Sequence, residues 1–217
     1  MENIRSCHTG PRGGRFHHLF PTFDKFNSRR SNFPFREIPD AETKKWLIEL
    51  SATDSIPTSN IDGYSESANN AFEPRESHKG NVARAVFYFY TMYPQYPMSR
   101  VGDINMLYAW HLADAVDQAE KDRNAKIAAH QGNRNPYVDN PELVCLAWEV
   151  DKDEAKVILI SMSKDPGLVD QDTCGSPTGG GCDEIKAAAI KVLESAASEL
   201  EATLSAIRAE IEKLKKQ

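Results

Sequence analysis

Residues 80–93 read GNVARAVFYFYTMY, and the pattern of apolar residues in this stretch indicates the fold class of the chain. Val82, Val86, Tyr90 and Tyr93 recur at the spacing of one helical face. The alanines and phenylalanines between them widen this face until the helix is apolar nearly all round, which is typical of a buried helix. The stretch therefore predicts a helix in the core of a globular domain.

The sequence on either side of this helix predicts a helix-rich α+β domain over residues 1–165. Asp103 is a suitable N-cap for one helix, and Asn140-Pro141 places a second N-cap before a proline at the first helical position. Residues 156–162 read KVILISM, a β-branched run that favours a strand. The other expected elements are a short helix over 41–50, a polar loop over 51–71, and helices over 103–112, 117–130 and 141–148.

The composition changes after Pro166. Residues 166–182 contain a run rich in Gly, Pro, Ser and Asp, which predicts a linker. Residues 183–217 carry apolar positions in alternating steps of three and four: Ile190, Leu193, Ala197, Leu200, Leu204, Ile207, Ile211 and Leu214. This heptad pattern predicts a long helix that either self-associates as a coiled coil, making a homo-oligomer, or folds back onto the domain.

The net charge of −6 hides a gradient along the chain. Residues 1–36 carry seven basic and two acidic side chains, whereas residues 149–217 carry nine basic and fourteen acidic ones. A surface that binds phosphates is therefore expected near the N-terminal end. No apolar run is long enough to cross a membrane, and the first fifteen residues contain no signal peptide core, so no membrane contact is expected.

The four cysteines show neither a CxxC pair nor zinc spacing, so structural zinc is not expected. Cys174 and Cys182 flank a Gly/Pro-rich loop. They would form a disulfide in an oxidising compartment and remain free thiols otherwise.

Residues 16–32 read FHHLFPTFDKFNSRRSN and hold the candidate chemistry of the chain. Two imidazoles, an amide and two guanidinium groups lie within one short unit. Hydrolysis of a phosphodiester by a one-metal nuclease needs such groups: a base, a ligand for a divalent cation, and cations that hold the backbone. Without further information, surface or helix-capping roles are the commoner explanation for these residue types.

This segment resembles the second half of the His-Me finger (ββα-metal) site of bacterial endonuclease I proteins, D-L-H-H-L-x-P followed by V-N-x-x-R-S-N-F. Residues 73–85, EPRESHKGNVARA, are similar to that family's E-P-x-x-x-x-K-G-x-x-A-R-A segment. The residues LYAWH at 107–111, DRN at 122–124 and QGNRNPYVD at 131–139 continue the resemblance in order. The similarity covers residues 15–148, and it implies a metal-dependent endonuclease of low sequence specificity that acts on DNA, and on RNA as a further substrate.

The resemblance implies a role for several residues of this chain. Asn27 takes the place of the metal-binding asparagine, with Mg²⁺ as the expected cofactor or Ca²⁺ or Mn²⁺ in its stead. His17 and His18 are candidate catalytic residues, although hydrogen bonding that orders the finger is the more frequent role of such a pair. Phosphate contacts are expected from basic residues near the metal site, namely Arg29, Arg30 and Arg134. Structural roles are expected for Arg84 and Glu73, which would pair inside the domain because an unpaired buried charge is costly.

The sequence departs from the family at its N-terminal end. The family's Glu-His pair, which supplies the general base and a second metal ligand, should precede Phe16, but this sequence contains no Glu-His pair. An N-terminally truncated finger is therefore expected. Two rival hypotheses follow: a nucleic-acid-binding remnant with impaired catalysis, and an interaction protein that oligomerises through residues 183–217. The compartment is not fixed by the sequence, although the resemblance suggests a secreted or periplasmic protein.

Overall fold

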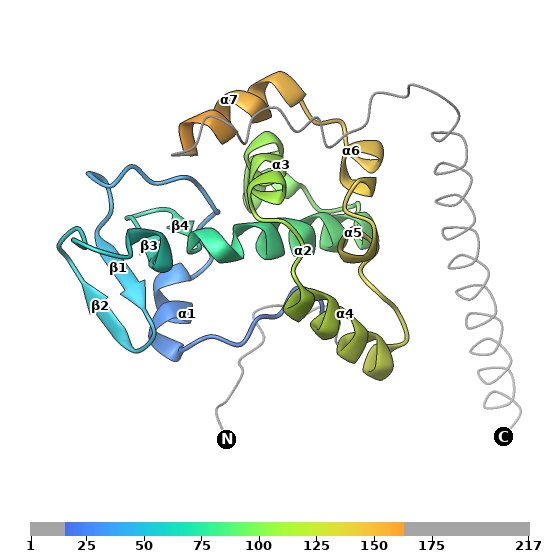
Figure 1. Cartoon of the computed structure of the whole chain (residues 1–217), viewed down its shortest axis with the longest axis horizontal. Helices are drawn as coiled ribbons and strands as arrows, with labels where there is room; N and C mark the ends of the chain where they lie inside the picture. The colour runs from blue at the N-terminus through green and yellow to red at the C-terminus, as the bar shows by residue number, and fades with distance from the viewer. Residues whose placement is uncertain (1–15, 163–217) are drawn as a thin grey trace, which may run out of the picture. The chain divides into compact units, whose positions relative to one another are not determined.

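The computed structural model describes residues 16–162, in which helices surround a central helix and a small sheet lies at one end (Figure 1). The α-helices are α1 (Asp24–Arg30), α2 (Lys79–Met92), α3 (Ile104–Ala113), α4 (Gln118–Gln131), α5 (Pro136–Asp139), α6 (Leu143–Ala147) and α7 (Lys152–Met162). The 3-10 turns are η1 (Ile61–Gly63), η2 (Glu76–His78) and η3 (Met98–Arg100). The strands are β1 (Lys45–Ile48), β2 (Ser51–Thr53), β3 (Ser65–Ser67) and β4 (Phe72–Glu73). This mixture confirms the prediction of a helix-rich α+β domain.

Helix α2 forms the centre of the core, as the sequence predicts. Phe87 on α2 and Leu107 and Trp110 on α3 have no exposed surface. Helix α3 packs against α2, and α7 packs against α3 on the side away from α2 (Figure 1). The apolar face of residues 80–93 is therefore covered by the helices that follow it in the chain.

The helices predicted to begin at Asp103 and near Asp117 are also confirmed. The Asp103 carboxylate accepts hydrogen bonds from the first turn of α3, and Asp117 caps α4 in the same way. The helix predicted over 141–148 is present only as α6, and Asn140 does not cap it. The pairing of an asparagine cap with a following proline instead starts α5, where Asn135 precedes Pro136.

The prediction of a helix over residues 41–50 is wrong, because this segment contains strand β1. Trp46 and Leu47 are both buried, and β1 is the second strand of an antiparallel sheet with the order β2-β1-β3-β4. Residues 51–71, expected to be loop, supply β2 and β3, the neighbours of β1. Glu49, with φ of 47°, lies in the two-residue turn that joins β1 to β2 and interrupts any helix.

The prediction of a strand over residues 156–162 is also wrong, because these residues belong to helix α7. The side chain of Asp151 accepts hydrogen bonds from the backbone N–H groups of Asp153 and Glu154, which fixes the start of the helix. Ala155 and Leu159, four residues apart, bury one face of α7. Capping and burial of this face outweigh the strand propensity of the β-branched residues.

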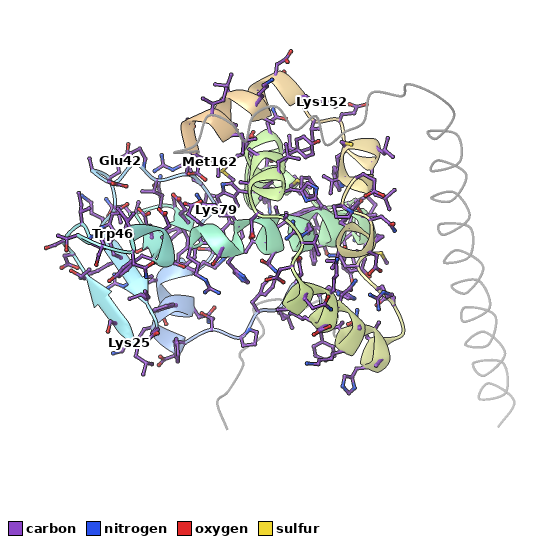
Figure 2. The ribbon with its side chains drawn as sticks, viewed as in Figure 1. Lys25, Glu42, Trp46, Lys79, Lys152 and Met162 are labelled. Atoms are coloured by element: carbon purple, nitrogen blue, oxygen red, sulfur yellow. The ribbon has the colours of Figure 1, made fainter. Side chains whose placement is uncertain are left out.

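A buried lysine joins the start of α2 to the sheet. The Lys79 ammonium lies within 2.8 Å of carboxylate oxygens of Glu37 and Glu73 and within 2.7 Å of Glu76. It also lies over the ring of Trp110, at 5.5 Å from the ring centre. Burial alone would lower the pKa of Lys79, but the three carboxylates together raise it. The lysine, which Figure 2 labels at the start of α2, is therefore charged and compensates much of the negative charge of these carboxylates.

Burial in the sheet raises the pKa of Glu66 from 4.5 to about 7, against the opposing hydrogen bond from Thr43. The folded chain therefore holds a proton at Glu66 that the unfolded chain releases above its own lower pKa. This group stabilises the folded state fully below about pH 4.5, and its contribution is lost as the pH rises to about 7.

We expect Glu66→Gln to remove this part of the pH dependence, on the order of 3 kcal/mol at most. The variant should therefore be more stable than the natural chain at pH 8 and similar to it at pH 4. Urea unfolding between these two pH values measures the difference. Parallel stability curves for the two proteins would contradict the assignment of the proton to Glu66.

None of the helices within residues 16–162 has the length and apolar character that crossing a membrane requires. The predicted linker, the heptad helix over 183–217 and the alternatives for Cys174 and Cys182 lie outside the described residues.

Candidate functional site

Helix α1 carries Asn27, the residue that the resemblance makes a metal ligand. An acidic residue, Asp24, lies in the first turn, and Arg29 and Arg30 lie in the last, so the charges match the helix dipole. The Asn27 side chain is exposed, and no side-chain hydrogen bond joins it to any other residue between 16 and 162. Its amide oxygen is therefore accessible from solvent.

Arg123 on α4 holds the chain segment that leads into α1. Its guanidinium donates hydrogen bonds to the carbonyl oxygens of Phe16 at 2.9 Å, Leu19 at 2.6 Å and His17 at 3.3 Å. The same group lies over the ring of Phe20, at 4.4 Å from the ring centre. One side chain thus satisfies three backbone acceptors of an irregular segment and fixes its path toward α1.

His17 and His18 both pack against α2. His17 is 2% exposed, and its Nε2 lies 3.0 Å from the carbonyl oxygen of Asn133. Because a carbonyl oxygen only accepts, Nε2 carries the proton in this contact. The rings of His17 and His18 meet Tyr88 and Phe89 edge-on, at 4.9 Å and 5.0 Å. These contacts suit side chains that anchor the segment, whereas the catalytic role of the two histidines stays a prediction.

The three arginines expected to bind phosphate differ in their surroundings. Arg29 is exposed and lines a groove together with other residues of α1 and of the β1-β2 hairpin. Arg30 donates to the carbonyl oxygen of Ser31 at 2.8 Å and lies over the ring of Phe35. Arg134 makes two hydrogen bonds of 2.7 Å to Asp139, which compensates its charge locally. Arg29 is thus the best placed of the three to meet an external anion.

Arg84 is internally paired, but not with Glu73 as the sequence suggested. Its guanidinium contacts the carboxylate of Glu120 on α4 at 2.6 Å, and both side chains are buried. Glu73 pairs instead with Lys79. Sequence reasoning identified the need for a partner but not its identity, because Glu120 becomes a neighbour of Arg84 only through the packing of α4 against α2.

Two grooves flank the segment formed by residues 20–29. The first, here called the α1 groove, has a volume of about 450 Å³ and is lined by Asp24, Lys25, Ser28, Arg29, Lys45, Leu47 and Ala52. The second, here called the His78 groove, has a volume of about 300 Å³ and is lined by Phe20, Pro21, Arg75, Ser77, His78, Asn81, Asp117, Ala119, Glu120 and Arg123. Asn27, His17 and His18 line neither groove, so neither brings these three residues together.

His78 gives the second groove a neutral ring at ordinary pH. Burial, reinforced by the positive charges of Arg75 and Arg123, lowers the pKa of His78 from 6.5 to about 4. Its imidazole lies edge-on to Phe20, with 4.8 Å between the ring centres. The ring is therefore suited to hydrogen bonding rather than to attracting an anion by charge.

The resemblance predicts a divalent metal ion at Asn27, and the described residues supply few further ligands for it. Asn27 supplies one neutral oxygen, and Asp24 lies one turn earlier on the same helix. Among residues 16–162, no three His, Cys, Asp or Glu side chains lie close enough together to hold a metal ion. Mg²⁺ keeps several waters and is completed by substrate phosphates, so a single amide fits such an ion as one ligand of a larger set.

We expect Arg123→Met to loosen the segment that leads into α1. Methionine keeps the apolar stem but removes a donor from three carbonyl oxygens, of which that of Phe16 still accepts from the Leu19 N–H, at a cost of about 1–3 kcal/mol. Hydrogen exchange followed by mass spectrometry should show faster exchange in peptides covering residues 16–23. Lys121→Met, at an exposed position on the same helix, is the matched control. Equal exchange in both variants would contradict the role of Arg123 in holding this segment.

Sequence reasoning missed several residues of this region. Arg123, His78 and Lys79 lay within matched segments, but their partners are set by tertiary packing. Lys25 and Lys45 were also missed as a pair, because β1 was expected to be helical. The positive charge of the N-terminal segment was the only signal that pointed to Lys25.

Comparison with known proteins identifies a family and several relatives. The family model described as Endonuclease I matches residues 7–142. An extracellular ribonuclease of Bacillus amyloliquefaciens is 32% identical over 159 residues, which covers 64% of this chain and 47% of that protein. An extracellular ribonuclease of Bacillus subtilis is 31% identical over 155 residues, covering 64% of this chain and 48% of that protein.

An extracellular deoxyribonuclease of Aeromonas hydrophila is 28% identical over 131 residues, with coverage of 58% of this chain and 49% of that protein. The chain thus spans about half the length of these curated relatives. No solved structure matches it. Since the family model covers well over half of the sequence, from Cys7 to Glu142, the chain belongs to the endonuclease I family.

Proposed function

We propose that the chain hydrolyses phosphodiester bonds of nucleic acids with little sequence preference. The observation that carries the proposal is the family match over residues 7–142, which includes the exposed Asn27 on α1 and the basic residues around it. Contacts from Arg29 and its neighbours would fall on phosphates, and phosphate contacts carry no sequence information.

Both DNA and RNA are proposed as substrates. The relatives include proteins named as ribonucleases and one named as a deoxyribonuclease. Their names also describe them as extracellular, and we propose secretion for this protein as well. Cys145, the only cysteine among residues 16–162, is disulfide-bonded, which fits an oxidising compartment.

We propose Mg²⁺, or Ca²⁺ or Mn²⁺, as the cofactor, with Asn27 as one protein ligand. When bound, a divalent ion stabilises the charge that develops on the transferring phosphate and on the leaving oxygen. Arg29 would hold the strand beside α1. Arg123, together with His17 and His18, would fix the segment that positions this helix.

Slow turnover is expected for this chain. Its sequence contains no Glu-His pair, so the general base and second ligand of the family have no counterpart in it. A positioned general base contributes roughly 10²- to 10⁴-fold. The chain should therefore cleave far more slowly than a relative that carries the pair.

Cleavage assays on supercoiled plasmid and on a folded RNA test the proposal. We expect nicking of the plasmid and fragmentation of the RNA with Mg²⁺, and neither in the presence of EDTA. Products that are unchanged by EDTA would contradict the metal dependence. A complete absence of products at high protein concentration and long incubation would contradict the hydrolytic function.

A second candidate function is binding of nucleic acid without cleavage. The basic residues at the end of α1, together with the lack of a Glu-His pair in this sequence, favour it. The same samples distinguish the two functions, because a binding protein would retard the plasmid in a gel but leave it supercoiled.

A further inference from the structure

The residues that line the α1 groove come from helix α1 and from the hairpin formed by β1 and β2, two elements that lie at the same end of the domain in Figure 1. Lys25, Ser28 and Arg29 line it from the helix, and Lys45 lines it from β1. In Figure 2, Lys25 lies at the same end of the domain as Trp46, the neighbour of Lys45. The groove is therefore built by two elements that are separate in sequence.

The lining of the groove has a surplus of positive charge. Three of its residues are basic, and Asp24 is the only acidic one. Lys25 and Arg29 are exposed, and neither side chain forms an ion pair or hydrogen bond with another residue between 16 and 162. Like charges four residues apart destabilise a helix slightly, so their placement is costly unless an anion lies between them. Lys45, by contrast, is paired with Asp54.

Lys25 and Arg29, the two cations of the groove that are unpaired within residues 16–162, lie on the side of α1 opposite Asn27. Successive residues of an α-helix are rotated by about 100°. Lys25 and Arg29, each two residues from Asn27, therefore lie about 160° away from it around the axis. An anion held between Lys25 and Arg29 would therefore be a different phosphate from the one that contacts Asn27.

Its lining suits a phosphate backbone better than a base. Nucleobases bind to proteins largely by stacking on aromatic rings, and none of the seven residues that line this groove is aromatic. The two cations and the hydroxyl of Ser28 can instead contact phosphate oxygens.

We propose that the α1 groove binds the backbone of a nucleic-acid strand away from the cleavage position. The helix is about 10 Å wide, so the phosphates that Lys25 and Arg29 contact would be different ones from the phosphate at Asn27. The strand would thus cross α1, with one part at Asn27 and another between Lys25 and Arg29. This inference rests on the proposed function for the identity of the anion.

The test measures binding of a labelled single-stranded oligonucleotide to the full chain by fluorescence anisotropy, in EDTA so that no cleavage occurs. Loss of two phosphate contacts lowers the slope of log K against log salt by about 1.4. Between 50 and 200 mM KCl, the natural chain should therefore lose roughly sevenfold more affinity than the Lys25→Gln/Arg29→Gln variant. Arg36→Gln/Lys121→Gln, with the same change of net charge outside the groove, should keep the natural slope.

Equal slopes for the natural chain and the Lys25→Gln/Arg29→Gln variant would overturn the proposal, as would an equal loss in the control variant. Inorganic phosphate at constant ionic strength should not displace the oligonucleotide, and displacement at equimolar phosphate would contradict binding of a strand. Thermal unfolding checks that each variant is folded. If the chain cleaves nucleic acid but the Lys25→Gln/Arg29→Gln variant keeps the natural salt slope, only the binding role of the groove is refuted. If the variant changes the slope but the natural chain does not cleave, only the hydrolytic function is refuted.

Discussion

Replacing Lys79 by methionine is expected to lower the free energy of unfolding by about 3–5 kcal/mol near neutral pH. Methionine fills a similar volume but leaves the carboxylates of Glu37, Glu73 and Glu76 without the ammonium that contacts all three. The Glu73 side chain is 5% exposed, so water cannot replace the lost charge there, whereas Glu37 and Glu76 are partly exposed. Urea unfolding measures the loss, which is a large part of the stability of an ordinary domain.

Measuring the destabilisation by Lys79→Met at several pH values distinguishes the loss of the ammonium charge from the loss of side-chain packing. Burial raises the pKa of Glu73, although Lys79 opposes this shift, and burial also raises the pKa of Glu76. Below these pKa values the carboxyl groups of Glu73 and Glu76 are protonated, and the repulsion between the carboxylates disappears. The destabilisation by Lys79→Met should therefore shrink as the pH falls. Arg36→Met, which breaks an exposed pair with Glu42, should cost less than about 1 kcal/mol. A destabilisation of Lys79→Met that does not change with pH would contradict the electrostatic account.

Replacing Asn27 by alanine is expected to lower kcat/KM for cleavage by roughly 100-fold, equivalent to about 2.7 kcal/mol of transition-state stabilisation. The exposed amide oxygen on α1 is the only metal ligand of the family that this sequence retains by resemblance. Initial rates on a labelled oligonucleotide over a range of Mg²⁺ concentrations measure the effect. The Mg²⁺ concentration needed for half-maximal rate should rise in the variant.

Asn32→Ala is the matched control, because Asn32 is another exposed asparagine shortly after the end of α1. It should keep the natural rate and Mg²⁺ dependence. Stability should be nearly unchanged in both variants, since neither side chain is buried. A natural rate for Asn27→Ala would refute the assignment of this residue as a metal ligand.

Elements that carry their own periodicity or caps could be predicted from the sequence. The apolar face of residues 80–93 defines α2, and the carboxylates of Asp103 and Asp117 mark the starts of α3 and α4. Segments whose state depends on distant partners could not. Residues 45–48 form a strand because β2 and β3 lie beside them, and residues 156–162 are helical because Ala155 and Leu159 bury one face against the core.

The residues of the candidate site likewise fall into those that the sequence could predict and those that it could not. The resemblance selected Asn27 and the basic residues around it, which are local in sequence. The sequence could not show that Arg123 holds residues 16–20 or that Arg84 pairs with Glu120, because these contacts join residues 36 to 107 positions apart. The α1 groove was hidden for the same reason, since Lys45 enters it only when residues 45–48 form a strand.

The proposed role of α1 as the metal-binding end of a nuclease centre can be tested by a Mn²⁺ titration of the ¹⁵N-labelled chain. Paramagnetic Mn²⁺ broadens the NMR signals of nearby groups. At low Mn²⁺ we expect selective loss of the NMR signals of the Asn27 side-chain amide and of the backbone amides of Asp24–Arg30. The loss of the backbone signals should be much weaker in Asn27→Ala. Broadening that spares α1, or that is the same in both proteins, would contradict this role of α1.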